Sequence, residues 1–177
     1  MDLMKTLSQH ITNDHVQQIS QQIGADQSST NQAVKAAIPV LISAIANHAS
    51  QPGGAEVLQN TLQNHDGGIL NDLMGYLRNS AGSNPGGGIL GQVLGSQQGA
   101  IQDAISRKTG LDPNSAGQLL SVLAPVVMGA LAKAQNQNGF DPGALSGYLN
   151  QQSQQAQSSH PQITDILGGI AKNIFGK

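Results

Sequence analysis

A pattern of glycine, aspartate and proline occurs twice in this chain, 86 residues apart. Residues 24–47 align with residues 110–133 without a gap. An internal repeat defines the structural unit of a chain, so it bears on the fold before any single motif does. We therefore expect two related halves. Eight positions are identical in the two stretches: Gly24/Gly110, Asp26/Asp112, Ser29/Ser115, Gln32/Gln118, Pro39/Pro125, Val40/Val126, Ala44/Ala130 and Ala46/Ala132.

Each repeated stretch has the pattern of one helix ending and a longer helix beginning. Gly24 and Gly110 suit the left-handed position that follows a helix. Asp26 and Asp112 supply side-chain oxygens that can cap the next helix. That helix carries apolar residues at spacings of four, three and four, which is typical of a helix with one face in the core. The apolar positions are Val34, Ile38, Leu41 and Ile45 in the first half and Leu120, Ala124, Val127 and Leu131 in the second.

Pro39 and Pro125 fall in the middle of these two long helices. An interior proline removes one backbone hydrogen bond and clashes with the carbonyl four residues earlier, at a cost of about 3 kcal/mol. Because both halves carry the proline at the same place, we expect either a kinked central helix or a helix split in two. We assign structural rather than chemical roles to six residues: Gly24, Asp26, Pro39, Gly110, Asp112 and Pro125.

The expected fold class is all-α, a compact array of short helices, because no alternating run of β-branched or aromatic residues indicates a strand. The chain is divided into two pseudo-repeats of about 86 residues each. The N-terminal pseudo-repeat spans 1–80, a Gly/Ser/Pro linker spans 81–88, and the C-terminal pseudo-repeat spans 89–177. Residues 151–159 are a Gln/Ser-rich insertion, which we expect to be a frayed helical extension or a disordered loop.

The composition excludes several classes of function. Charged residues make up 10% of the chain, against roughly 25% in an average soluble protein, so Gln, Asn and Ser must provide the polar surface. The net charge is −2 and the eight Lys and Arg are scattered, whereas a nucleic-acid binder needs several cations on one face. Cysteine is absent, which excludes disulfides and thiolate metal sites. No leader peptide or long apolar run is found, so we expect a cytoplasmic protein.

The second half resembles a known bacterial family. Residues 110–116 (GLDPNSA), with Leu123-Ala124-Pro125 and residues 128–131 (MGAL), are similar to the YidB-like family, a domain-of-unknown-function family. Residues 88–96 (GILGQVLGS) also resemble members of that family, and the first half fits the same pattern. The resemblance implies a compact array of short helices in a soluble bacterial protein. It implies no activity, cofactor or catalytic residue.

The residues that could carry chemistry are better explained by structure. His10 and His15 stand five apart across an expected helix break, which is not the i, i+4 ligand pair of a zinc-binding helix. We interpret these two, and the scattered His48, His65 and His160, as surface or capping residues. Residues 86–91 match Gly-x-Gly-x-x-Gly but follow no strand, so they indicate a joint leading into a helix. No Gly-x-Ser-x-Gly elbow is present. We therefore expect no enzyme, no cofactor and no metal site.

Two functions from different classes remain. The first is a helical module that binds a protein partner or a second copy of itself, through an apolar patch of several hundred square ångströms. The alternative is a peripheral protein that docks on a membrane surface through the amphipathic segment 162–177, which carries Lys172 and Lys177 late in the sequence. With only two lysines in the segment, its apolar residues Ile163, Ile166, Leu167, Ile170 and Ile174 are better explained by closing the core.

Overall fold

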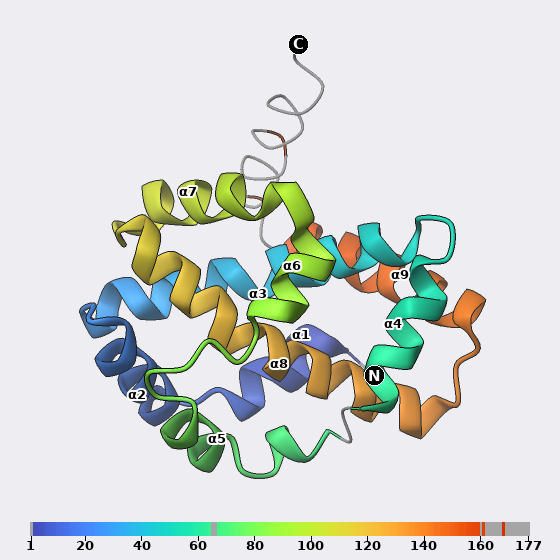
Figure 1. Cartoon of the computed structure of the whole chain (residues 1–177), viewed down its shortest axis with the longest axis horizontal. Coiled ribbons are helices and arrows are strands. Elements are labelled where there is room, and N and C mark those ends of the chain that lie inside the picture. Colours follow the sequence, from blue (N-terminus) through green and yellow to red (C-terminus); the bar gives the residue numbers. More distant parts are fainter. Residues whose placement is uncertain (1, 65–66, 160, 162–167, 169–177) are drawn as a thin grey trace.

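The two longest helices, α3 and α8, run through the middle of the molecule, and the remaining helices are arranged around them (Figure 1). The computed structural model describes residues 2–64, 67–159, 161 and 168, and every regular element in this part of the chain is helical. The predicted all-α class is therefore confirmed. The predicted amphipathic segment 162–177 lies outside the described residues, except for Gly168. The elements are α1 (Leu3–His10), α2 (Asn13–Ile23), α3 (Gln27–Ala49), α4 (Gly54–Gln63), η1 (Gly68–Leu70), α5 (Leu73–Asn79), α6 (Gly87–Leu94), η2 (Gly95–Gln97), α7 (Gln98–Thr109), α8 (Pro113–Asn138) and α9 (Pro142–Ser159).

The central parts of α3 and α8 are buried on all sides. Every residue from Ala37 to Ala46 and from Leu119 to Ala132 is buried. The apolar positions predicted from the sequence do lie in the core. The prediction that only one face of each helix is buried was wrong, because a helix surrounded by other helices is apolar on all sides. By length and composition alone, α8 could cross a membrane. However, 89% of its most apolar 18-residue stretch is buried inside the fold, which is typical of a core helix.

Glycine and aspartate define the corners before both long helices. Gly24 and Gly110 end α2 and α7 with φ angles of 66° and 76°, a left-handed conformation that residues with a Cβ rarely adopt. Asp26 then caps α3, where its Oδ1 accepts a hydrogen bond from Ser29 N at 2.8 Å. Asp112 caps α8 in the same way. Both caps form as expected from the sequence.

Both long helices continue through their internal prolines, so the split helix considered above does not occur. Pro125 has no N–H, which leaves the Ser121 carbonyl without its usual donor four residues later. Gly86 lies against this carbonyl: a Cβ on Gly86 would be 2.1 Å from Ser121 O and 2.9 Å from Pro125 Cδ. One residue further, Gly87 begins α6, inside the linker predicted at 81–88.

The two predicted halves share one hydrophobic core. A single cluster of buried residues extends from Leu3 to Leu149. In space, α9 lies along α3, and α8 contacts α1, α2 and α3, so elements from opposite ends of the chain are neighbours (Figure 1). The buried hydroxyls of Ser43 on α3 and Ser153 on α9 are 3.0 Å apart and join the halves further. Neither half therefore has a separate core.

The Gln/Ser-rich stretch 151–159 is the continuous second part of α9. Gln152, Ser153 and Ala156 are buried, because this face of α9 turns towards the core. Gln152 Oε1 accepts a hydrogen bond of 2.8 Å from Leu3 N, at the first turn of α1. A stretch that resembles a low-complexity insertion is thus a packed helix that satisfies the backbone of the opposite end of the chain.

Candidate binding cleft

The surface between α2, α6, α7 and α8 is hollowed into a cleft of about 450 Å³. Residues from the connection between α5 and α6 form the remaining wall. This volume is within the range of small-ligand pockets, about 300–1,000 Å³. We call it the amide cleft, because six of its lining residues are Gln or Asn. The lining consists of Gln22, Ile23, Ser80, Gly82, Ser83, Asn84, Leu90, Gln98, Gln102, Pro113, Asn114, Gly117, Gln118, Ser121 and Val122.

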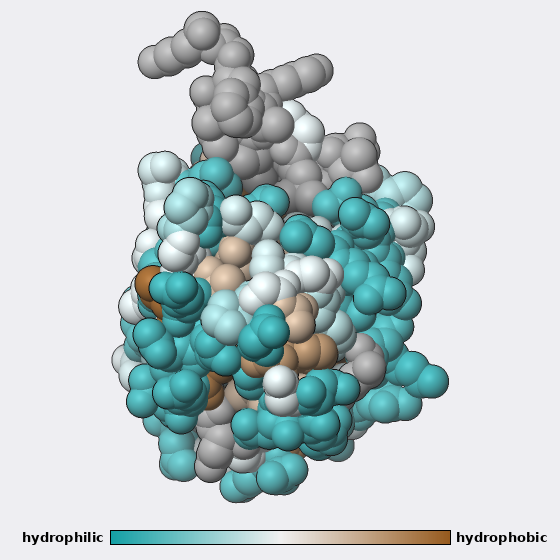
Figure 2. Space-filling model, turned by 90° about the vertical axis from the view of Figure 1, so that its right-hand side faces the viewer, coloured by the Kyte–Doolittle hydropathy of each residue, from teal (hydrophilic) through white to brown (hydrophobic). Residues whose placement is uncertain are grey.

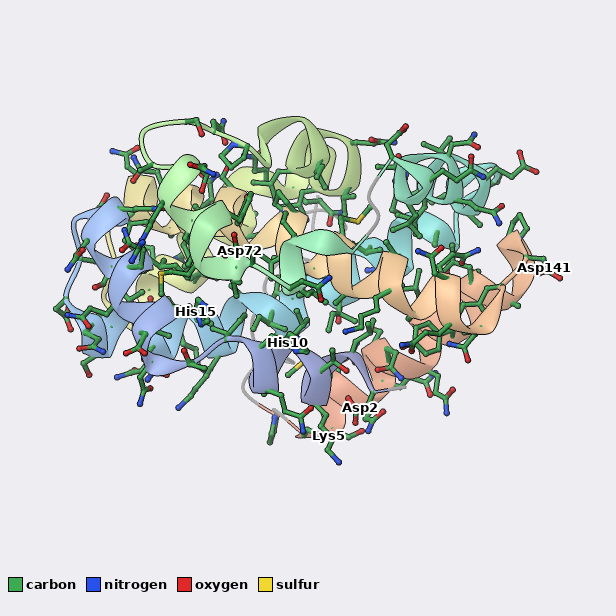
Figure 3. The ribbon with its side chains drawn as sticks, turned by 90° about the horizontal axis from the view of Figure 1, so that it is seen from below. Asp2, Lys5, His10, His15, Asp72 and Asp141 are labelled. Carbon is green, nitrogen blue, oxygen red and sulfur yellow. The ribbon has the colours of Figure 1, made fainter. Side chains whose placement is uncertain are left out.

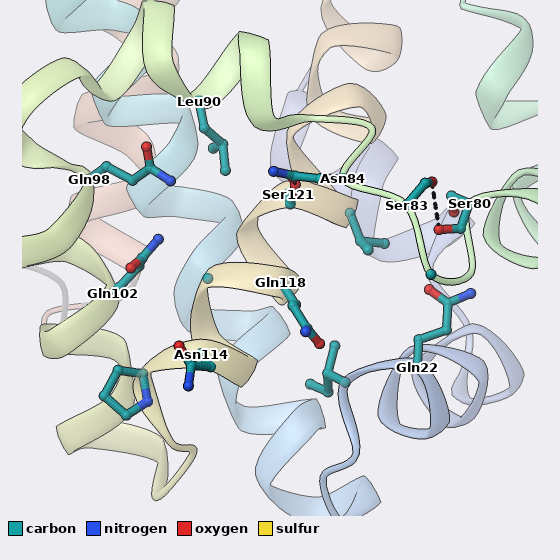
Figure 4. A pocket seen from close by; sticks show the side chains of 15 residues that line it. Gln22, Ser80, Ser83, Asn84, Leu90, Gln98, Gln102, Asn114, Gln118 and Ser121 are labelled. Atoms are coloured by element: carbon teal, nitrogen blue, oxygen red, sulfur yellow. Dashed lines mark hydrogen bonds between the residues drawn. The ribbon is translucent and has the colours of Figure 1, made fainter.

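Three glutamine side chains converge on the space enclosed by the cleft. Gln98 and Gln102 extend into it from α7, and Gln118 extends into it from α8 (Figure 4). None of the three carboxamides has a hydrogen-bond partner within the described part of the chain. A carboxamide carries an acceptor oxygen and two N–H donors. The cleft therefore presents both donors and acceptors to whatever enters it.

The floor of the cleft depends on a glycine inside a helix. A Cβ on Gly117 of α8 would lie 2.9 Å from Gln102 Nε2, which is too close for the amide to stay where it is. Glycine in a helix interior costs about 1 kcal/mol relative to alanine. The missing side chain leaves room for the Gln102 amide beside the α8 backbone.

The wall between α5 and α6 is held by its own hydrogen bonds. Ser83 Oγ donates to Ser80 O at 2.8 Å (Figure 4). Ser121 Oγ, on α8, donates to Asn84 Oδ1 and fastens the connection to the cleft floor. Gln22 Nε2 on α2 donates to Leu77 O near the end of α5. These contacts give the cleft a defined shape, while Gln98, Gln102 and Gln118 remain available.

Behind this wall, Tyr76 links α5 to α8. Its hydroxyl donates to Val122 O at 3.4 Å. Burial raises the pKa of Tyr76 to about 12. Tyr76 thus joins α5 to α8 through a main-chain carbonyl, and the Ser121–Asn84 contact joins the α5–α6 connection to the same part of α8.

No charged residue, histidine or tyrosine lines the amide cleft. Asp112 is next in sequence to the lining residue Pro113, but it is engaged in capping α8. Its Oδ1 accepts from Asn114 N at 3.0 Å and from Ser115 N at 3.1 Å. The Ser115 hydroxyl, and then these main-chain groups, hold the pKa of Asp112 below its ordinary value of 3.8. The cleft can therefore bind through hydrogen bonds but offers no acid or base beside its serines.

A smaller pocket of about 180 Å³ lies between α1, α2 and α3. It is lined mainly by apolar side chains, together with Lys35, Ser8 and two asparagines. Four lining residues of this pocket stand 86 positions before lining residues of the amide cleft: Met4 before Leu90, Val16 before Gln102, Asn31 before Gly117 and Lys35 before Ser121. Lys35 and Ser121 also precede the two prolines by four residues. Each pocket thus has in its lining the residue whose carbonyl loses its usual i+4 donor to an internal proline.

None of the six residues singled out from the sequence lines the amide cleft. Gly24 and Asp26 form one corner, Gly110 and Asp112 form the other, and the two prolines are buried in α3 and α8. The corners meet at the Ser115 hydroxyl, whose single hydrogen is shared between Ile23 O, 2.8 Å away across the two halves, and Asp112 Oδ2. Sequence analysis missed the cleft amides; the only signals were the richness in Gln and Asn and the position of Gln118 within the repeat.

The described histidines and acidic residues do not form a catalytic or metal-binding cluster. The charged and histidine side chains labelled in Figure 3 lie apart from one another, and His10 and His15 are on separate helices. His48, which we interpreted as a surface or capping residue, is instead half-buried, and its Nε2 is buried with no hydrogen-bond partner among the described residues. His15 Nδ1 accepts from Thr12 N at 3.1 Å, which confirms its role in capping α2. Within the described residues, no three His, Asp or Glu side chains could hold a metal ion together. His65 and His160 lie outside the described residues.

A family model for bacterial proteins of unknown function, DUF937, matches residues 5–134 as one continuous range. This range covers well over half of the 177 residues. The chain belongs to the DUF937 family. Every residue that lines the amide cleft lies within the matched range, whereas α9 lies beyond it. The cleft is therefore built from the part of the chain that the DUF937 family defines.

Searches of curated proteins and of solved structures produced no match to the chain. Family membership brings no known activity with it, because the DUF937 family is itself of unknown function. The function must be argued from the cleft.

Proposed function

We propose that this protein is a non-enzymatic binding module of the bacterial cytoplasm, which acts by holding another protein or a second copy of itself. The observation that carries the proposal is the amide cleft: a shaped cavity of about 450 Å³ whose lining contains no charged or histidine side chain. Recognition in such a cleft relies on hydrogen bonds and shape. Low charge over the whole chain, 10% of residues, is in keeping with this mode of binding.

The absence of acid–base groups from the lining supports a binding role over catalysis. Ser80, Ser83 and Ser121 line the cleft, but a serine hydroxyl needs an adjacent general base to become a nucleophile. The Ser83 and Ser121 hydroxyls are instead committed to hydrogen bonds that hold the wall. The cleft thus has the groups of a binding site without those of a hydrolase.

An apolar docking patch has little support on the described surface. Among the described residues, Val57 is the one large hydrophobic side chain that is exposed, at 44%. The face drawn in Figure 2 is mostly hydrophilic, with a limited apolar area near its middle. Contacts with a partner are therefore better placed in the polar cleft than on the apolar patch expected from the sequence.

We further propose that the two halves are pseudo-repeats of a YidB-like unit, each with a central helix bent at its internal proline, as the repeated sequence pattern indicates. Support comes from equivalent helix caps before α3 and α8 and from the equivalent positions of the two pockets. The halves differ where the pockets differ: Val16 and Asn31 in the first stand where Gln102 and Gly117 open the amide cleft in the second. Duplication followed by divergence would explain why the amide cleft is lined by more amides than its counterpart between α1, α2 and α3.

In-cell photo-crosslinking tests the proposed function. A photoreactive phenylalanine analogue replaces Gln118 in the cleft, and the control carries it at Asn136, an exposed position on the same helix outside the lining. We expect an adduct from position 118 and none from position 136. An adduct at twice 18.2 kDa identifies a second copy, and another mass identifies another protein. Equal labelling at both positions, or no adduct at all, contradicts the proposal.

Light scattering on a sizing column complements this experiment. Measured across about a hundredfold range of concentration, a rise above 18.2 kDa shows self-association. If the cleft is the contact, Gln118→Arg abolishes the rise, because it places an unpaired charge in a neutral site. If the mass in solution stays at 18.2 kDa at every concentration, the partner in the proposed function is a different protein rather than a second copy.

Docking on a membrane surface through residues 162–177 remains the alternative, and it is based on the sequence alone. Sedimentation with vesicles of anionic lipid tests it. Removal of residues 162–177 should abolish sedimentation and leave the melting curve unchanged if this segment is a membrane anchor.

A further inference from the structure

We propose that the amide cleft binds an uncharged, extended polypeptide segment through the main-chain amides of that segment. This inference rests on the proposed function and specifies its ligand. It follows from three observations: the free carboxamides of the cleft, the way glutamines bind main chain elsewhere in this protein, and the neutrality of the lining.

Peptide groups are the natural complement of the free cleft side chains. Each carboxamide of Gln98, Gln102 and Gln118 presents one acceptor and two donors, and each peptide group presents one donor and one acceptor. Two of these glutamines are on α7 and the third is on the facing helix α8 (Figure 4). A chain lying in the cleft therefore meets hydrogen-bonding groups from both helices.

Glutamine side chains already bind main-chain groups at several places in this molecule. Gln152 Oε1 accepts from Leu3 N at 2.8 Å, and Gln59 Nε2 donates to Phe140 O at 3.2 Å, both across long stretches of sequence. In the cleft itself, Gln22 Nε2 donates to the carbonyl of Leu77. Inside the fold, then, glutamine carboxamides bind the backbone of other segments. The cleft glutamines have the same chemistry, and within the described residues they make no hydrogen bond to another segment.

The neutral lining selects an uncharged segment. A bound carboxylate, phosphate or ammonium group would lose water without gaining a partner of opposite charge, which is costly. The lining also holds no aromatic ring on which a sugar could stack. Ile23, Leu90 and Val122 give the cleft a limited apolar area, which suits the aliphatic carbons of small side chains.

The test uses the full chain and a defined probe. The probe is a hexapeptide of glycine, serine and glutamine, acetylated and amidated at its ends so that it carries no charge. Matched hexapeptides with lysine or with glutamate, and the neutral disaccharide maltose, serve as competitors. Nuclear magnetic resonance titration reports binding at the side-chain amides of Gln98, Gln102 and Gln118.

Gly117→Ala separates binding from folding. The added methyl displaces the Gln102 amide, a flexible group, while alanine favours the helix. The matched control is Gly147→Ala on α9, where a Cβ meets nothing within 4 Å and the residue is outside the cleft. Both variants should melt at or above the wild-type temperature, and only Gly117→Ala should lose affinity, by about tenfold.

We expect the neutral peptide to bind with a dissociation constant below about 1 mM and to shift the three cleft amides. Tighter binding of a charged peptide or of maltose overturns the inference, as does the absence of binding by the neutral peptide. Equal loss of affinity in both glycine variants also overturns it. If crosslinking from position 118 succeeds while the neutral peptide does not bind, the proposed function stands and the ligand is a folded surface instead.

Discussion

Asp26 and Asp112 each begin a long core helix, and their charge state makes the stability of the fold depend on pH. The serine three residues later, through its hydroxyl and then its main-chain N–H, holds the pKa of each aspartate below 3.8. A folded-state pKa below the unfolded value means that the unfolded chain binds protons more readily. The contribution of these caps is therefore complete above pH 3.8 and is lost as the pH falls through the lower, folded-state pKa.

Asp112→Asn should reduce this acid sensitivity while keeping the helix capped. Asparagine caps a helix about as well as aspartate but does not titrate. We expect urea-unfolding midpoints near the wild-type value at about pH 6, and a shallower decrease than wild type down to about pH 2.5. If the urea-unfolding midpoints of the wild type and of Asp112→Asn decrease equally as the pH falls, Asp112 is not a source of the acid sensitivity.

Gly86 and Gly88 are close in sequence but respond oppositely to a methyl group. A Cβ on Gly86 would lie 2.1 Å from the main-chain Ser121 O, and a Cβ on Gly88 meets nothing within 4 Å. Gly86→Ala should lower the free energy of unfolding by roughly 1–3 kcal/mol, because the α8 backbone must shift. Gly88→Ala should be neutral or stabilising by up to ~1 kcal/mol, because it replaces a helical glycine. Denaturant titration of both variants distinguishes them, and equal effects would contradict the close approach at Pro125.

Among the helices, α9 shows how a segment of low sequence complexity gains a fixed structure. Its Gln152 accepts from Leu3 N, a buried donor at the start of α1 that no turn of helix can satisfy. Asp2 adds a second contact, since its Oδ2 accepts from Gln155 Nε2 at 2.7 Å. The polar side chains of α9 are therefore specific partners of α1.

Gln152→Ala should destabilise the protein by roughly 1–3 kcal/mol, because the buried Leu3 N–H loses its acceptor. The control is Gln151→Ala, at the preceding exposed position of α9, which should change stability by less than about 0.5 kcal/mol. Hydrogen exchange provides a second measurement: the amide of Leu3 should exchange faster in Gln152→Ala only. If the two variants behave alike, Gln152 does not cap α1 in solution.

The molecule as a whole is held together by contacts between its two halves. The core cluster includes residues from both, α9 packs on α3, and Ser115 reaches the end of α2. A folded chain must bury enough apolar surface to offset the conformational entropy that it loses. Because the two halves share one core, we expect that neither half alone buries enough apolar surface to fold. The full chain should therefore unfold in one cooperative transition.

Fragments 1–80 and 89–177 test this dependence. Each should show little helical circular dichroism alone, and mixing them should restore helix and a cooperative melt. The full chain is the reference, and its calorimetric enthalpy of unfolding should equal its van't Hoff enthalpy, as for a two-state transition. A cooperative melt of either fragment alone would show that the halves are independent domains.

The helices of this protein and the corners between them could be predicted from its sequence, because the interactions that form them act between residues close in sequence. Left-handed glycines, aspartate caps and helical periodicity act within a few residues, so the corners at Gly24 and Gly110 and the all-α class were predictable. The prolines were also located correctly. The sequence left open whether each proline bends its helix or splits it; the contact of the Ser121 carbonyl with Gly86 depends on a segment distant in sequence and was not predictable.

The amide cleft, the shared core and the order of residues 151–159 depend on contacts between distant parts of the chain. Gln98, Gln102 and Gln118 look like ordinary surface residues until α7 and α8 are placed face to face. Likewise, the Gln/Ser composition of α9 predicts weak packing, and only the position of Leu3 gives Gln152 a buried partner. Sequence patterns specify which segments are helical, since backbone preferences are local. Which polar side chains are satisfied and which remain free to bind depends on how those helices pack.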